Sequence, residues 1–178
     1  MRRRRIIQWA VVGVLVAVLV VVVVLRVTGC PLSGSRGDGG VIPNTAPDFS
    51  LPTLDGGTVE LSQLRGKWVL LNFWTTWCHF CVVQQPYLQA AYDERAGVIE
   101  FVGINLGEGE ERVRSHTDAD ITFTIALDTR QTTGTAYGVR YLPTLVLIDK
   151  EGVVRGIRNG AFGSKAELDA WLDQRVSG

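Results

Sequence analysis

Residues 68–81 read WVLLNFWTTWCHFC, an unbroken apolar run followed closely by two cysteines three positions apart. Seven consecutive large apolar or amide residues at 68–74 are typical of a central strand buried on both faces. Residues 79–95 then carry apolar side chains at helical spacing, with Pro86 as a predicted kink. Two cysteines so spaced at the start of a helix can close a small disulfide with little backbone movement.

The two cysteines predict redox chemistry. Cys78 begins the predicted helix, where unpaired amides and the positive end of the helix dipole favour a thiolate. Because thiolate is the attacking species in disulfide exchange, we predict Cys78 as the nucleophile and Cys81 as the residue that resolves the mixed disulfide. Two other interpretations stay open: an inert structural disulfide, and half of a zinc site, which would need about four ligands.

The rest of the chain alternates strands and helices. A short hairpin, formed by residues 49–51 and 59–61 around an Asp-Gly-Gly turn, is predicted ahead of the first long strand. The elements predicted after the first helix are strands at 98–105, 123–127, 144–148 and 153–157 and helices at 108–117, 129–137 and from Ser164 to about Trp171. This order predicts an α/β fold with a mixed central sheet.

Three stretches together resemble a known family. NFWTTWCHFC at 72–81 and YGVRYLPTLVLIDKEGVV at 137–154 resemble the thioredoxin superfamily. More narrowly, they are similar to the membrane-anchored, extracytoplasmic TlpA/ResA-type thiol-disulfide oxidoreductases, whose N-terminal hairpin and first core strand are matched by residues 46–74. The resemblance implies a thioredoxin-like fold with Pro143 as a cis-proline facing the cysteines. Leu142 would then present its backbone to an extended substrate.

The chain also departs from that family in ways that should tune the redox pair. His79-Phe80 stands where proline is common, Gln84 where many members carry glutamate, and Asn72 where thioredoxin has a buried aspartate. Protonated His79 would stabilise the neighbouring thiolate, and an uncharged Gln84 removes a repulsion of similar size. With Trp77, these residues are our candidate tuning positions. We predict a reductant somewhat less reducing than thioredoxin, without metal or cofactor.

The N-terminus predicts a membrane anchor. Arg2–Arg5 precede Ile6–Leu25, 20 residues in which only Gln8 is plainly polar, and a helix of that length crosses the roughly 30 Å hydrocarbon core. Arginines on one flank hold that end in the cytoplasm. The predicted organisation is a cytoplasmic basic segment (1–5), a transmembrane signal anchor (6–26), a flexible Gly/Ser/Pro tether (27–45) and an extracytoplasmic thioredoxin-like domain (46–178).

Two alternatives to the anchor place the domain on the same side of the membrane. Val27-Thr28-Gly29-Cys30 resembles a lipobox, so that Cys30 would be acylated, and a cleaved signal peptide would release the domain altogether. Each of the three topologies predicts a domain outside the cytoplasm.

Composition and resemblance together predict the partners. The chain holds 18 Lys and Arg against 18 Asp and Glu, which argues against a general nucleic-acid binder. We expect exported thiol and disulfide proteins as substrates, apocytochrome c being one candidate, and a membrane thiol-disulfide carrier as electron donor. Alternatives are a disulfide-forming oxidase, a copper chaperone and a thiol peroxidase. Thr75 fits the peroxidase pattern three positions before Cys78, but Leu71 stands where that pattern needs proline.

Overall fold

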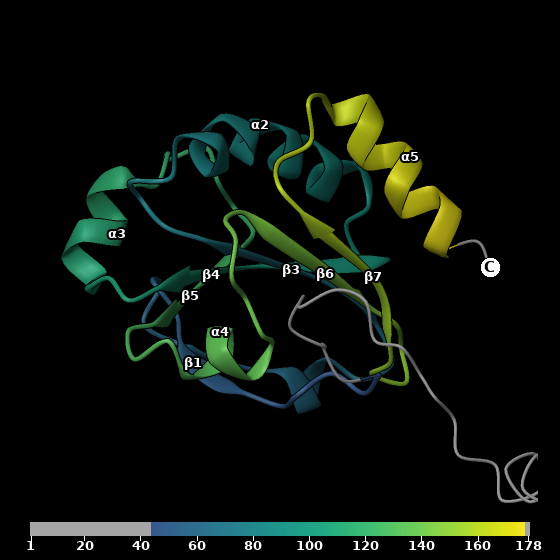
Figure 1. Cartoon of the computed structure of the whole chain (residues 1–178), viewed down its shortest axis with the longest axis horizontal. Helices are drawn as coiled ribbons and strands as arrows, with labels where there is room; N and C mark the ends of the chain where they lie inside the picture. Colours follow the sequence, from purple (N-terminus) through teal and green to yellow (C-terminus); the bar gives the residue numbers. More distant parts are fainter. Residues whose placement is uncertain (1–43, 177–178) are drawn as a thin grey trace, which may run out of the picture. The chain divides into compact units, whose positions relative to one another are not determined.

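A computed structural model describes residues 44–176 of the chain, and its centre is a five-stranded mixed sheet (Figure 1). The strand order is β5-β4-β3-β6-β7; β3, β4 and β5 run parallel, whereas β6 is antiparallel to β3 and β7 to β6. The strands are β3 (Trp68–Trp74), β4 (Ile99–Leu106), β5 (Thr124–Asp128), β6 (Thr144–Ile148) and β7 (Val154–Asn159). The α/β fold and the mixed sheet predicted from the sequence are confirmed.

Layers cover both faces of this sheet. Helices α2 (His79–Glu94) and α5 (Lys165–Val176) pack on one face, as Figure 1 shows. The other face is covered by the hairpin of β1 (Ser50–Pro52) and β2 (Thr58–Glu60), together with η1 (Leu61–Leu64) and α4 (Thr132–Ala136). A further helix, α3 (Glu110–His116), follows β4.

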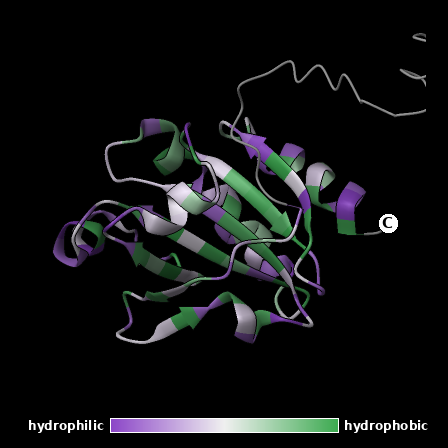
Figure 2. Cartoon of the chain, turned by 60° about the horizontal axis from the view of Figure 1, so that its bottom comes forward, coloured by the Kyte–Doolittle hydropathy of each residue, from purple (hydrophilic) through white to green (hydrophobic). Residues whose placement is uncertain are grey.

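Strand β3 explains why both layers form. Successive side chains of a strand point to opposite faces, so Leu70 and Trp74 pack towards the helices α2 and α5, while Leu71 and Phe73 pack towards the hairpin. All four side chains are buried, and Figure 2 shows hydrophobic residues running along the central strands. The apolar run that the sequence displays therefore forms the central strand of the domain, as predicted.

Helix ends differ modestly from the predictions. Helix α3 begins two residues later than expected, because Gly109 is extended (φ −77°, ψ 156°) and serves as its N-cap. Helix α5 continues to Val176 instead of ending near Trp171, since Leu172 is buried in the core and the Arg175 guanidinium lies 4.4 Å from the Trp171 ring. The 3₁₀ helix η1 has no counterpart among the predicted elements.

At its N-terminal end the described chain already pairs with the β6–β7 hairpin. Thr45 forms an antiparallel bridge with Val153, and the Asn44 carbonyl accepts a hydrogen bond from the Val154 amide at 2.9 Å. The predicted membrane-spanning segment 6–26 and Cys30 lie outside the described residues. Within 44–176, the structure has no helix both long and apolar enough to span a membrane.

Candidate active site

The two cysteines of the C-x-x-C motif are joined by a disulfide at the start of α2. Cys78 is the N-cap of this helix, and its Sγ accepts a hydrogen bond from the Cys81 amide at 3.2 Å. The Cα atoms lie 5.2 Å apart, within the usual range for a disulfide. After reduction the same amide and the positive end of the helix dipole would face the Cys78 sulfur and favour its thiolate form.

Accessibility distinguishes the two cysteines. Cys78 is 7% exposed, whereas Cys81 is completely buried against the core. The residues around them are open to solvent: Trp77 and Phe80 are 69% and 67% exposed, and His79 lies between the cysteines on the exposed first turn of α2. An incoming sulfur can therefore reach Cys78 more readily than Cys81.

The Leu142–Pro143 peptide bond is cis. Leu142 packs against the core cluster that contains both cysteines. It also lines, with Trp77, a cleft of about 310 Å³. The Pro143 carbonyl accepts a hydrogen bond from the Gly160 amide at 2.8 Å, so that the loop is fixed to the end of β7. The cleft places Leu142 near Trp77, and the substrate-binding role of Leu142 and Pro143, named from the resemblance, stays a prediction.

The amides expected to tune the redox pair bind each other. Gln84 is 1% exposed, and its Nε2 donates to the Asn72 Oδ1 at 3.1 Å. The Gln84 Oε1 accepts a hydrogen bond from the Phe162 amide at 3.3 Å. Both side chains are buried and uncharged, and Gln84 follows Cys81 by three residues on α2. Their effect on the redox pair stays a prediction.

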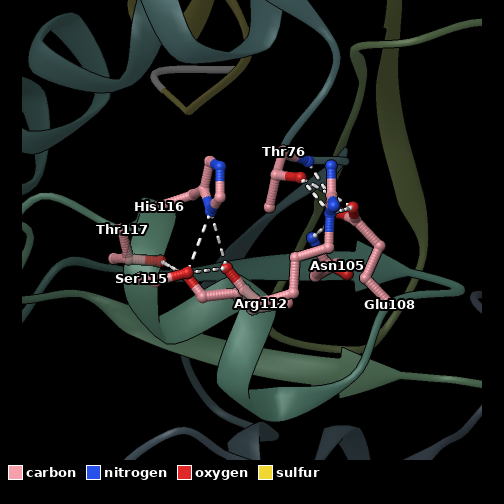
Figure 3. A network of polar contacts seen from close by, with 8 residues as sticks. Thr76, Asn105, Glu108, Arg112, Ser115, His116 and Thr117 are labelled. Carbon is pink, nitrogen blue, oxygen red and sulfur yellow. Dashed lines mark hydrogen bonds and ion pairs between the residues drawn. The ribbon is translucent and has the colours of Figure 1, made fainter.

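A buried carboxylate that the sequence analysis did not single out also reaches the active-site loop (Figure 3). Glu108 accepts hydrogen bonds from the Thr76 amide and the Thr76 hydroxyl, both at 2.7 Å. It also accepts from the Asn105 Nδ2 at 2.9 Å and pairs with the Arg112 Nε at 2.8 Å. Thr76 lies two residues before Cys78, so this network holds the segment from which the redox pair projects.

The network decides the ionisation of Glu108. Burial opposes the charged form, but the hydrogen bonds from Thr76, Asn105 and Arg112 outweigh it and hold the pKa of Glu108 below its ordinary value. A carboxylate that accepts four hydrogen bonds has its acceptor positions filled. Glu108 is therefore charged at neutral pH and acts as an anchor for the loop.

The order of the strands could have indicated that Glu108 lies near the cysteines. It follows β4 as Cys78 follows β3, and the carboxyl ends of parallel neighbouring strands lie at the same edge of a sheet. The sequence analysis placed Glu108 only at the start of a predicted helix, at 108–117, and gave it no role at the site. Among residues 44–176, no group of three or more His, Cys, Asp or Glu side chains could hold a metal ion.

Comparison with known proteins agrees with this geometry. The model of the AhpC/TSA family matches residues 42–157. Among curated proteins, the chain is 41% identical over 135 residues to the thiol-disulfide oxidoreductase ResA of Geobacillus thermodenitrificans, an alignment that covers 74% of this chain and 76% of that protein.

Solved structures give the same result. A thiol:disulfide interchange protein of the thioredoxin family from Chlorobium tepidum has a TM-score of 0.67 at 28% identity and covers 76% of this chain and 98% of that one. The exposed lipoprotein thioredoxin Etrx1 from Streptococcus pneumoniae has a TM-score of 0.64 at 28% identity, with 72% and 99% covered. The fold, the paired cysteines and these similarities all point to thiol-disulfide exchange.

Proposed function

Since the chain belongs to the AhpC/TSA family and is a thiol-disulfide oxidoreductase of thioredoxin-like fold, we propose that it reduces disulfide bonds of exported proteins on the outer face of the membrane. The arrangement of the redox pair carries this proposal: Cys78 at the helix N-terminus is 7% exposed, whereas its disulfide partner Cys81 is fully buried. The TlpA/ResA resemblance implies the reducing direction.

In the proposed reaction, electrons pass from the protein to the substrate. The Cys78 thiolate attacks one sulfur of the substrate disulfide; the substrate S–S bond breaks, its other sulfur leaves as a thiolate, and a mixed disulfide forms. The Cys81 thiolate then attacks the Cys78 Sγ and releases the second substrate sulfur. Cys78 and Cys81 end as a disulfide, and the substrate gains two electrons and takes up two protons from water.

The surface around Cys78 suits a polypeptide substrate. Trp77, Phe80 and Tyr141 are each about two-thirds exposed, which is unusual for large apolar side chains in a folded domain. Trp77 precedes Cys78, Phe80 precedes Cys81, and Tyr141 belongs to the loop with the cis-proline. An unfolded segment with its own apolar side chains would cover this surface while its disulfide meets Cys78.

The proposed location depends on the N-terminal sequence. Arg2–Arg5 and the apolar run Ile6–Leu25 support a single-pass anchor with the catalytic domain outside the cytoplasm. Acylation of Cys30 is the second possibility, and the similarity to Etrx1, described as an exposed lipoprotein, is compatible with it. In either case a membrane thiol-disulfide carrier would return two electrons to the Cys78–Cys81 disulfide, and apocytochrome c is one candidate among exported substrates.

The test uses the full-length protein in detergent. We expect it to catalyse reduction of insulin disulfides, and equilibration with glutathione buffers should give a reduction potential nearer to thioredoxin than to strong oxidants. The Cys81→Ala variant should retain its substrates as mixed disulfides in cells. A strongly oxidising potential would instead identify a disulfide-forming oxidase, and rapid peroxide consumption would identify a thiol peroxidase.

A further inference from the structure

A groove of about 540 Å³ lies along α2, the helix that begins with the redox pair, and outside the site described above. One wall is a stripe of α2 from Val82, which directly follows Cys81, to Asp93. The opposite wall is the end of α3 and the segment that follows it, with lining residues at 115–118, 120 and 121. A polypeptide whose disulfide meets Cys78 could extend directly into this groove.

The groove contains one nearly buried polar side chain, that of Gln85, without a hydrogen-bond partner among residues 44–176. Gln85 is 3% exposed and lines the groove, and no hydrogen bond within residues 44–176 uses its carboxamide. Buried polar groups normally have partners, so the Gln85 carboxamide, whose oxygen can accept a hydrogen bond, suits a donor supplied by a ligand.

The rim of the groove is acidic. Asp93, Asp118 and Asp120 line it, and none of the three forms an ion pair within the described part of the chain. Among the lining residues only His116 can carry a positive charge; its Nδ1 lies 2.9 Å from the Arg112 carbonyl and 3.0 Å from the Ser115 hydroxyl (Figure 3). Asp93 accepts a hydrogen bond from the Gln89 Nε2 and Asp118 one from the Asp120 amide, both uncharged donors, so that the negative charge of the rim favours a cationic ligand.

We propose that this groove binds a lysine or arginine side chain of the substrate polypeptide, close in sequence to the cysteine that reacts with Cys78. The inference rests on the proposed function and narrows it to substrates with a basic residue near their disulfide. A bound metal ion is not the alternative here, because residues 44–176 contain no cluster of metal-ligating side chains.

The length of the groove limits how far the basic residue can lie from the reactive cysteine in the substrate sequence. From Val82 to Asp93 the helix advances eleven residues, or about 16 Å at 1.5 Å per residue. An extended chain covers about 3.3 Å per residue. The basic residue should therefore lie within about five positions of the substrate cysteine.

The experiment compares two model peptide disulfides that differ at one residue, arginine or glutamate, four positions from the cysteine. The full-length protein in detergent should favour the arginine peptide by about fivefold in kcat/KM, mainly through KM, which is the size expected for exposed charge pairs. The preference should decline as salt is added. Hydroxyethyl disulfide, too small to reach the groove, reports whether the redox pair itself works.

Variants in which amides replace carboxylates show whether the preference for the arginine peptide depends on the groove. The Asp118→Asn/Asp120→Asn double variant should lose the preference and keep its rate with hydroxyethyl disulfide. The matched control, Glu111→Gln/Glu151→Gln, removes two exposed carboxylates that do not line the groove and should keep the preference.

Peptides in which serine replaces the reactive cysteine can bind the groove but cannot undergo disulfide exchange. Their affinity therefore tests this inference separately from the proposed function. Fluorescence anisotropy should show tighter binding of the arginine version. Equal binding and equal kcat/KM for both peptides would overturn the groove proposal, while turnover of hydroxyethyl disulfide would leave the reductase function standing. Selective binding of the arginine version without turnover of any disulfide would support the groove and overturn the reductase function.

Discussion

The carboxylate of Glu108 holds Thr76 by two hydrogen bonds, one from its backbone amide and one from its hydroxyl, each 2.7 Å long. The two residues are 32 positions apart in the chain and meet only because β3 and β4 are neighbouring parallel strands. Arg112 donates both to Glu108 and, at 2.9 Å, to the Thr76 hydroxyl. The loop that leads to Cys78 is therefore fixed by a charged contact from the next strand.

We expect Glu108→Ala to destabilise the protein by about 2–4 kcal/mol, because it leaves the buried Thr76 amide and the Asn105 amide without acceptors. Thermal unfolding of the full-length protein measures this change. Glu110→Ala is the control: its exposed ion pair with Arg114 joins residues four apart on α3 and should matter by about 0.5 kcal/mol or less. Equal losses for the two variants would contradict the assigned role of Glu108.

The ionisation of Glu108 predicts how stability depends on pH. The hydrogen bonds lower its pKa in the folded protein below the ordinary value of 4.5, so its contribution is fully present above pH 4.5 and declines as the pH falls through the folded value. Glu108→Gln, which cannot change charge, should therefore lose less stability than the wild type between about pH 4.5 and pH 3. Unfolding temperatures measured across this range test the difference; parallel curves would show that Glu108 does not titrate as expected.

The two cysteines should have unequal roles. Cys78→Ser should abolish disulfide reduction, since the attacking thiolate is lost, and Cys81→Ser should accumulate mixed disulfides that cannot be resolved. Iodoacetamide applied to the reduced protein at neutral pH should label the more exposed Cys78 first. Mass spectrometry of the digested protein shows which cysteine is labelled. If Cys81 is labelled before Cys78, the two roles are reversed.

Replacing Gln84 by glutamate should make the protein more reducing. A carboxylate at this buried position would disfavour a nearby thiolate, and a change of about one pKa unit in the dithiol corresponds to about 30 mV. It would also face the Asn72 Oδ1 that now accepts from the Gln84 amide. Glutathione equilibration measures the potential, and Gln174→Glu, an exposed exchange of the same kind on α5, should leave it unchanged.

The N-terminal segment should behave as an uncleaved anchor. Alkaline-carbonate extraction should leave the full-length protein in the membrane fraction, because residues 6–26 are long and apolar enough to span the bilayer. Release of a shortened protein would favour a cleaved signal peptide. Palmitate labelling that disappears in Cys30→Ser would favour the lipoprotein alternative.

The sequence by itself determined the class of fold and the reactive pair. The apolar run at 68–74 has the length of a strand buried on both faces, and C-x-x-C at the start of the following helix brings two sulfurs within bonding reach. These are local relationships, carried by neighbours in the chain, so periodicity and spacing were enough to find them. The helix ends were less certain, because caps such as Gly109 and packing such as that of Leu172 depend on tertiary contacts.

Only the tertiary structure decided which distant residues share the site. Glu108 reads in sequence as one of several exposed acids, yet the parallel pairing of β3 with β4 buries it against Thr76, where hydrogen bonds compensate for the lost hydration of its charge. Gln85 reads as an ordinary polar residue of a helix, and its burial under the groove depends on how the segment after α3 crosses α2. Contacts of this kind depend on the packing of whole elements, which the order of residues along one strand or one helix does not reveal.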